Sequence, residues 1–327
     1  MSVEELDLVV AFLDVGHGDS AIVRFREGHQ VRTIVIDGGG PDHPERLLSY
    51  LVRNAITTVD LLVASHIDRN HIAGLVPLVE SDRVTIHHFW GPGCESTQPS
   101  VSGLRTTDER TYQRIYSRLT QRVRPEGMAC PTRGMPLPRL FTDATVTVLN
   151  PPRANVLKPP PKNAPVHKPE ELTLEQNELA LVLHIESHGL RMLFPSDVEG
   201  AFWGNVLQDA GLQRYLDVNI LKVPHYGQSN GLPLGVMQFV NTDYAVLSLG
   251  ATTDKQPSLD ILNLMQERGA EVICTQHPVK NSFCRNPNCP ASHGGQNIVF
   301  CRRKGDSSYS TSAYFCPLLG SGEKPSA

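Results

Sequence analysis

The sequence has no long apolar run. Its hydrophobic stretches all fall short of the ~20 residues that span a bilayer, and the first five residues, Met1 to Glu5, are acidic. We therefore expect no signal peptide, no transmembrane helix and no membrane partner. The chain also lacks an excess of positive charge, because 30 Lys and Arg stand against 34 Asp and Glu, for a net charge of −4. Any contact with nucleic acid must then come from a local patch.

Cysteine is sparse for a secreted protein. The 7 cysteines among 327 residues do not form the dense pattern of a disulfide scaffold, so we expect a reduced, cytoplasmic protein. A nucleotide-binding loop is missing too, because no Lys-Ser/Thr pair follows the Asp-Gly-Gly-Gly run at 37–40. That run is expected to be a turn, and Asp14 and Asp19 are expected to be structural acceptors in another turn.

Short apolar segments at strand and helix spacing fill most of the chain. Strands are expected at 8–13, 21–25, 31–36, 61–64, 144–149, 179–185, 190–194, 218–223, 244–249, 270–275 and 297–302. Helices are expected at 45–55, from 72 onward, and at 104–123, 199–211, 233–240 and 258–268. A proline-rich insertion at 151–171 interrupts the alternation, which then restarts. This order predicts an α/β fold in which two sheet-and-helix halves pack face to face.

Four side chains that can ligate a metal follow the apolar strand at 61–64. They are His66, Asp68, Asn70 and His71. A strand that ends in imidazole and carboxylate groups fixes its donors in space and can leave a coordination position open for water. That is what a hydrolytic metal site requires.

Two later apolar strands end in the same kind of residue, one in Asp197 and one in His225. Because ligands gather at the ends of neighbouring strands, we expect these donors to join the earlier cluster in one site that holds Zn²⁺ or Mn²⁺. Asp68, Asp197 and His225 are the expected catalytic groups. Taken singly, a histidine such as His71 is more often a helix-start or core residue than a ligand, and Asp197 could be a helix N-cap.

Five motifs occur in an order that resembles the hydrolase domain of ComEC-like DNA-uptake proteins, within the metallo-β-lactamase superfamily. They are FLDVGHGDS, IDGGG, SHIDRNHIAGL, FPSDVEG and LKVPHYGQSN, and AVLSLGATTDKQPS resembles the family's late strand and loop. The resemblance implies the metallo-β-lactamase-type αβ/βα four-layer sandwich. It also implies a mono- or dinuclear site that hydrolyses phosphodiester bonds. We place this domain at 1–304, with insertions at 151–171 and 274–296 and a tail at 305–327.

Two positions depart from the family's pattern. The family has His-x-Asp-x-Asp-His, but Asn70 replaces the second Asp, and an amide is a weaker ligand for a divalent cation than a carboxylate. Gln256 stands where relatives carry a His before the late-loop proline. Both changes fall on the side of a second metal, so we expect that metal to bind weakly and the basal rate to be low.

A second Cys/His cluster lies in the insertion at 274–296, and its spacing resembles a zinc knuckle. Four ligands close a tetrahedral structural site. The expected ligands of a structural Zn²⁺ are His277, Cys284, Cys289 and His293. The alternative is a loop in which these residues occur incidentally.

Arginines recur every four residues on the expected helix at 104–123, so they share one face. They are Arg110, Arg114, Arg118 and Arg122. Such a stripe can follow a phosphate backbone and bind substrate, or it can be a solvated charged face. Few aromatics accompany it, so stacking on single strands is not indicated.

These observations predict a metal-dependent hydrolase of phosphodiester bonds, nuclease-like, with DNA or RNA as substrate and a protein partner that completes or regulates the site. The alternative is a catalytically degenerate metallo-β-lactamase-fold module that binds or regulates. The two departures from the family pattern favour the module, whereas the retained donors favour the enzyme. A third reading is a hydrolase of carboxylic esters or amides.

Overall fold

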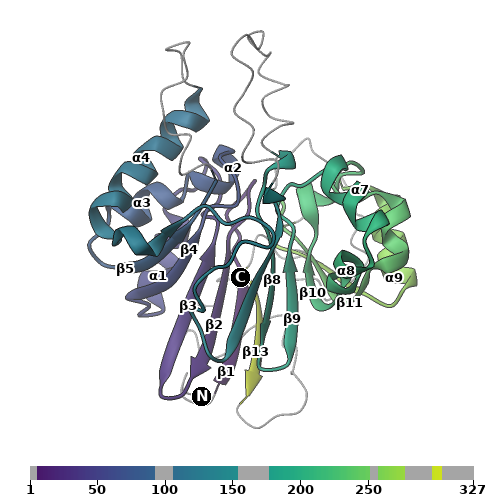
Figure 1. Ribbon diagram of the computed structural model, residues 1–327, viewed down its shortest axis with the longest axis horizontal. Helices are drawn as coiled ribbons and strands as arrows, with labels where there is room; N and C mark the ends of the chain where they lie inside the picture. Colours follow the sequence, from purple (N-terminus) through teal and green to yellow (C-terminus); the bar gives the residue numbers. More distant parts are fainter. Residues whose placement is uncertain (1–5, 93–105, 154–176, 251–256, 277–296, 304–327) are drawn as a thin grey trace, which may run out of the picture.

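The computed structural model describes residues 6–92, 106–153, 177–250, 257–276 and 297–303. Two β-sheets lie face to face, and helices cover the outer side of each sheet (Figure 1). The layers therefore run helix, sheet, sheet, helix. This confirms the αβ/βα four-layer sandwich expected from the sequence.

The first sheet has 7 strands in the order β13-β1-β2-β3-β4-β5-β6. The strands are β1 (Leu6–Phe12), β2 (Ala21–Glu27), β3 (Gln30–Ile36), β4 (Thr58–Val63), β5 (Thr85–Trp90), β6 (Met128–Ala129) and β13 (Ile298–Arg303). β13, β1, β2 and β3 pair antiparallel, and β3 to β6 pair parallel.

The second sheet has 6 strands in the order β12-β11-β10-β9-β8-β7. The strands are β7 (Ala144–Asn150), β8 (Val182–Ser187), β9 (Leu190–Phe194), β10 (Asp217–Lys222), β11 (Asn241–Leu247) and β12 (Glu271–Cys274). β7, β8 and β9 pair antiparallel, and β9 to β12 pair parallel. Each half of the chain thus starts with antiparallel strands and continues with parallel ones.

Helices of the first half pack outside the first sheet, and those of the second half lie outside the second sheet (Figure 1). The first set is α1 (Arg46–Arg53), α2 (Arg69–Ile72), α3 (Leu75–Glu80), α4 (Thr107–Arg122) and the 3-10 turn η2 (Pro125–Gly127). The second set is α7 (Gly200–Gln208), α8 (Ala210–Gln213) and α9 (Leu259–Glu267). The second half also has the 3-10 turns η3 (Arg214–Leu216), η4 (Pro224–Gly227) and η5 (Leu234–Phe239).

The core follows from the two-residue period of the strands. In β1, Phe12 and its same-face neighbours join the apolar core shared with the second sheet. Val9 and Ala11 point the other way, into the core beneath the helices of the first half. Both faces of β1 are therefore buried, which explains why it reads as a continuous apolar run.

Helix α4 forms where the sequence predicts it, because it has both a local N-terminal cap and a buried apolar face. Thr106 accepts a hydrogen bond from the Glu109 backbone N–H, and the Glu109 carboxylate accepts one from the Thr106 N–H, which forms a capping box. Tyr112, Ile115 and Leu119 recur at helical spacing and are buried. Burial of each such side chain stabilises the fold by about 1.5–3 kcal/mol.

Several expected elements differ in the structure. The helix expected at 199–211 is divided, because Asp209 adopts an extended backbone and its side chain caps the separate helix α8. The helix expected at 233–240 is the 3-10 helix η5, and the one expected from 72 onward is the pair α2 and α3. The last expected strand is present as β13, but it joins the sheet of the first half, beside β1.

Among the described residues, no helix is both long and apolar enough to cross a membrane. Several predicted features lie outside the described residues: Gln256, the tail, most of the proline-rich insertion, and the zinc ligands His277, Cys284, Cys289 and His293.

His184 in β8 provides a test of stability against pH away from the candidate site. Its ring packs against Tyr215 at 5.0 Å between centroids. Burial, with the positive charges of Arg191 and Arg214, lowers its pKa from 6.5 to about 4. The unfolded chain therefore takes up this proton first as the pH falls, and stability is lost between pH 6.5 and 4.

Replacing His184 by Phe keeps a ring against Tyr215 and removes the titration. We expect the free energy of unfolding of His184→Phe to fall less between neutral pH and pH 4.5 than that of wild type, by on the order of 2 kcal/mol. Urea unfolding at the two pH values measures this difference. His87→Phe, at a half-exposed site in β5, is the control. Equal pH dependence in wild type and His184→Phe would contradict the argument.

Candidate metal centre

The polar residues that form the site follow strands that end at the same edge of the molecule. Asp37 and His66 come after the parallel strands β3 and β4 of the first sheet. Asp197 and His225 come after the parallel strands β9 and β10 of the second sheet. Because the sheets face each other, the site lies between the two halves of the chain.

The segment after β4 folds into a short helix that presents His71 inward. Asp68 is the N-cap of α2, and its carboxylate accepts a hydrogen bond of 2.9 Å from the Asn70 N–H. The turn at Gly18 packs against this segment so closely that a Cβ there would lie 2.2 Å from the Asn70 carbonyl oxygen. The GHGDS turn therefore needs glycine at this point, where φ is +148°.

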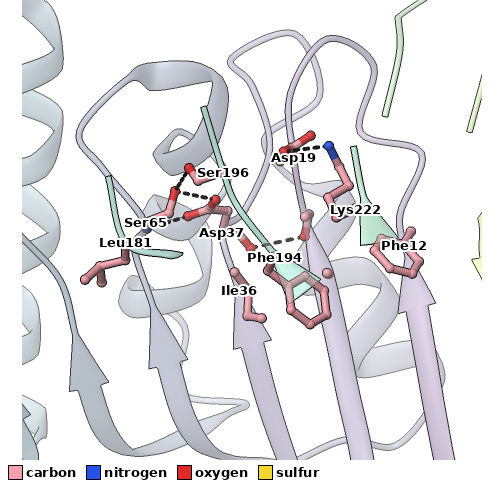
Figure 2. Close-up of a pocket in the computed structure, with 11 residues that line it drawn as sticks. Phe12, Asp19, Ile36, Asp37, Ser65, Leu181, Phe194, Ser196 and Lys222 are labelled. Atoms are coloured by element: carbon pink, nitrogen blue, oxygen red, sulfur yellow. Dashed lines mark hydrogen bonds and ion pairs between the residues drawn. The ribbon is translucent and has the colours of Figure 1, made fainter. Parts of the chain in front are cut away.

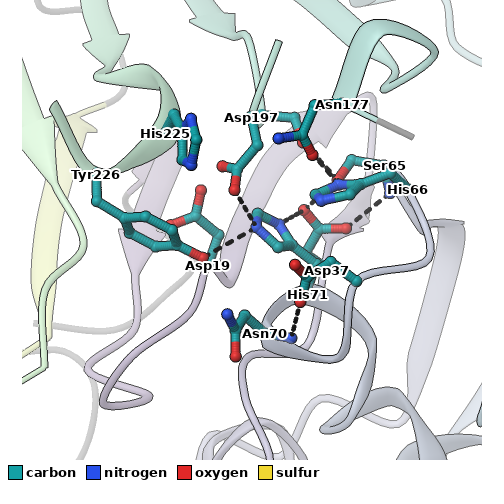
Figure 3. Close-up of polar contacts among 12 residues, drawn as sticks. Asp19, Asp37, Ser65, His66, Asn70, His71, Asn177, Asp197, His225 and Tyr226 are labelled. Carbon is teal, nitrogen blue, oxygen red and sulfur yellow. Dashed lines mark hydrogen bonds and ion pairs between the residues drawn. The ribbon is translucent and has the colours of Figure 1, made fainter. Parts of the chain in front are cut away.

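His66, His71 and Asp197 converge (Figure 3). One potential ligand atom from each lies within 4.8 Å of the others, and all three residues are buried. Asp68 and His225 are not part of this group. Asp68 and Asn70 are half-buried on the adjoining segment, and their predicted ligand roles stay predictions.

Asp37 orients His71. It has a left-handed backbone, with φ at 59°, which aims its carboxylate at the segment after β4. The carboxylate accepts hydrogen bonds of 2.7 Å from both the Ser65 N–H and the Ser65 hydroxyl, and it lies 2.8 Å from Nδ1 of His71. This contact holds a proton on Nδ1 and turns Nε2 toward the centre of the site.

Two hydroxyls hold His66 at its Nδ1, the same ring nitrogen at which Asp37 contacts His71. Its Nδ1 lies 3.0 Å from the Ser65 hydroxyl oxygen and 3.2 Å from that of Ser196, and these hydroxyls are hydrogen-bonded to each other at 2.7 Å. Ser196 comes from the second half of the chain, so the support of His66 crosses between the halves. Both imidazoles therefore present Nε2 to the centre.

The charges in this group are strongly coupled. Burial alone would lower the pKa of His71, but the Asp197 and Asp37 carboxylates raise it well above its ordinary value. The pKa of His66 is lowered, first by burial and then by the charge of His71. Burial would raise the pKa of Asp197, yet His71 and His66 hold it below its ordinary value. His71 and Asp197 thus form an ion pair, and a bound cation would replace the proton on Nε2 of His71.

The residues present fit a metal ion. Within the described part of the chain, His66 Nε2 and Asp197 Oδ1 are buried without a hydrogen-bond partner. Buried polar atoms are normally satisfied, so an unpaired imidazole nitrogen and carboxylate oxygen facing one point indicate a missing ligand. Two imidazoles and a carboxylate are also a usual donor set for Zn²⁺ and related cations.

His225 lies beside this group and has its own carboxylate partner. Its Nδ1 is 3.0 Å from Glu199 Oε1, and Glu199 in turn accepts a hydrogen bond of 2.9 Å from the Asn177 side chain. The positive charge of His225 also contributes to lowering the pKa of Asp197. Glu199 therefore places a carboxylate beside the Nδ1 side of the His225 ring, in an ion-pair contact that lacks hydrogen-bond geometry.

A buried ion pair lies next to the site. Lys222 Nζ is 2.9 Å from Asp19 Oδ2, and both side chains are less than a tenth exposed. They line a cavity between the sheets together with the Ser65 and Ser196 hydroxyls (Figure 2). Asp14 is a turn acceptor as expected, through the Gly16 N–H, whereas Asp19 serves mainly as the partner of Lys222.

The arginines of α4 are used in different ways. Arg122 donates to the carbonyl oxygens of Val79 and Val84, and Arg114 forms a bidentate pair with Glu80. Arg110 donates to the Thr107 hydroxyl at 3.1 Å, and Arg118 donates to the Gln121 side chain at 3.3 Å, both within their own helix. The substrate-binding role of these four residues stays a prediction, and Arg122 has a clear structural one.

Sequence reasoning missed several residues around the centre, namely Asp37, Ser65, Ser196, Glu199 and Tyr226. Their common feature is a place within a few residues of a predicted ligand or at the end of a neighbouring parallel strand. Asp37 was interpreted as a turn residue only, although a carboxylate at the end of β3 was a signal for this role.

The fold and the site define a two-sheet α/β protein of the metallo-β-lactamase-type architecture with a potential His/Asp metal site. No family model matches the chain, and no curated protein is significantly similar to it.

Among solved structures, the chain is distantly similar to the long-form RNase Z from yeast, at 12% identity and a TM-score of 0.42, covering 79% of this chain and 40% of that one. It is also similar to the metallo-β-lactamase-fold protein YhfI from Bacillus subtilis, at 13% identity and a TM-score of 0.41, covering 84% and 89%. A third is Zn²⁺-bound PqqB from Methylobacterium extorquens, at 12% identity and a TM-score of 0.44, covering 81% and 97%. At this distance they carry no argument about activity.

Proposed function

We propose that this protein is a metal-dependent hydrolase of phosphodiester bonds, with DNA or RNA as its substrate. The observation that carries the proposal is the convergence of His66, His71 and Asp197, with two of their buried donor atoms unpartnered. The choice of phosphodiesters is supported by the ordered motifs that resemble ComEC-like hydrolase domains.

Each residue of the site has a separate role in the proposed hydrolysis. His66, His71 and Asp197 would hold Zn²⁺ or Mn²⁺, and a bound cation would supply a nucleophile at neutral pH and neutralise the phosphate charge. Asp37 keeps Nε2 of His71 aimed at the cation. Glu199 lies beside Nδ1 of His225 as an ion-pair partner, and Nε2 of His225 would stabilise or protonate the departing oxygen.

A second reading is a binding or regulatory module that has lost catalysis. It is favoured by Asn70, because an amide replaces a carboxylate on the segment that carries His66 and His71. Under the enzyme proposal the same change makes the basal rate low and leaves room for a protein partner that completes the site. The structural Zn²⁺ of the 274–296 insertion and a cytoplasmic location remain further proposals.

The test is hydrolysis of single- and double-stranded DNA, RNA and a generic phosphodiester, with Mn²⁺, with Zn²⁺ and after chelation. We expect slow, cation-dependent and salt-sensitive cleavage, faster in Asn70→Asp because the added carboxylate strengthens cation binding. If wild type and Asn70→Asp are as inert with cations as after chelation on every substrate, the binding-module reading replaces the enzyme.

A further inference from the structure

Tyr226 follows His225 in the turn η4, and both residues have left-handed backbones, with φ at 56° and 46°. Two consecutive non-glycine residues in this region are costly, at about 1–3 kcal/mol each, and such strain concentrates at functional sites. The turn aims both side chains at the candidate metal centre (Figure 3). The Tyr226 side chain is fully buried.

The Tyr226 hydroxyl reaches the metal-facing atom of His71. Its oxygen lies 3.1 Å from His71 Nε2, and Asp197 Oδ2 lies 3.3 Å from that same nitrogen. Two donors at roughly 2.0–2.1 Å from one ion, at octahedral or tetrahedral angles, are about 2.9–3.4 Å apart. The separations of both oxygens from Nε2 are thus those of adjacent ligands on a single ion.

We propose that the Tyr226 phenol oxygen is a ligand of the metal centre, which gives a set of two imidazoles, one carboxylate and one phenolate. On binding, the cation replaces the phenol proton, which leaves to solvent. The inference rests on the proposed metal site and extends it by a residue type that the sequence motifs did not suggest. A phenolate ligand gives the centre a spectroscopic mark, because phenolate bound to Fe³⁺ has a charge-transfer band in visible light.

The experiment uses the full chain and two probes, Zn²⁺ for affinity and Fe³⁺ for the spectrum. Tyr226→Phe keeps the ring, which packs against His17 at 4.5 Å between centroids. Tyr112→Phe is the matched control, because Tyr112 in α4 is also a buried phenol but donates to the Pro92 carbonyl oxygen, away from the metal centre. We expect the visible band in Fe³⁺-loaded wild type and Tyr112→Phe and its loss in Tyr226→Phe, with Zn²⁺ affinity lowered at least about tenfold.

The outcomes separate the two proposals. If wild type binds neither cation, the proposed metal site falls and this inference with it. If wild type binds Zn²⁺ but Fe³⁺ gives no visible band, only the Tyr226 ligand is overturned, and this holds even if Tyr226→Phe does not fold. A band that persists in Tyr226→Phe, or tighter Zn²⁺ binding by that variant, also overturns it.

Discussion

Asp197→Asn is expected to lower the affinity for Zn²⁺ or Mn²⁺ by more than about 100-fold, the upper end of the loss when an outer hydrogen-bond partner of a metal ligand is removed. The physical reason is that asparagine keeps the shape of the side chain but removes the negative charge that Asp197 contributes to the group with His66 and His71. Cation-dependent hydrolysis should fall by at least the same factor. Calorimetric titration of the cation and the cleavage assay measure the two effects separately.

The matched control is Asp217→Asn in β10. Asp217 pairs with Arg191 at 2.7 Å, and its side chain is 47% exposed. This variant should keep wild-type cation affinity and activity. Asp197 is not the N-cap of the following helix, which is Glu199, so the N-cap alternative is wrong. Unchanged affinity in a folded Asp197→Asn would show that Asp197 is not a ligand.

Lys222→Met is expected to destabilise the fold by about 3–5 kcal/mol, because it leaves the carboxylate of Asp19 charged and buried without its partner. The pair is 2.9 Å long, and the two side chains are 4% and 8% exposed. Lys222 Nζ also donates to the Val223 carbonyl oxygen at 3.0 Å, so a second bond is lost. Urea unfolding in the presence of a chelator measures the change without a contribution from bound cation.

The double variant Asp19→Asn with Lys222→Met removes both charges. It should recover most of the lost stability, because replacing a whole buried pair by neutral groups is often nearly neutral. Arg191→Met, which breaks a half-exposed pair with Asp217, should cost no more than about 1 kcal/mol. A double variant as unstable as Lys222→Met would mean that packing of the lysine stem, and not the unpaired charge, is what matters.

The layers of the fold and the core of the site could be predicted from the sequence. Apolar runs of strand length, separated by helical spacing, predicted most elements and the division into two halves. His66 and Asp197 each come directly after such a run, one in each sheet, and they meet because the two sheets face each other with these strand ends at the same edge. Helix α4 was predicted almost to its bounds, since its capping box and apolar face are both local.

What could not be predicted depends on distant contacts or backbone angles. The place of Asp37 at the end of β3 is a sequence signal, but the left-handed backbone that aims its carboxylate at His71 has no signature in composition or spacing. The role of Ser196 depends on a hydroxyl from the other half of the chain. The helix divides into α7 and α8 because the Asp209 side chain caps α8, which outweighs the helix propensity of the segment. The apolar spacing of the sequence does not indicate this break.

Because β1 pairs with β13, the first strand to be synthesised must wait for a strand made near the end of the described chain. The partners Phe12 and Ile298 are roughly 290 residues apart, so at about 5–20 residues per second β1 waits on the order of 15–60 s for its neighbour. During that time β1 is an exposed, apolar edge strand, the kind of edge that recruits other chains. A slower ribosome lengthens the interval in which this edge is open to association with other nascent chains.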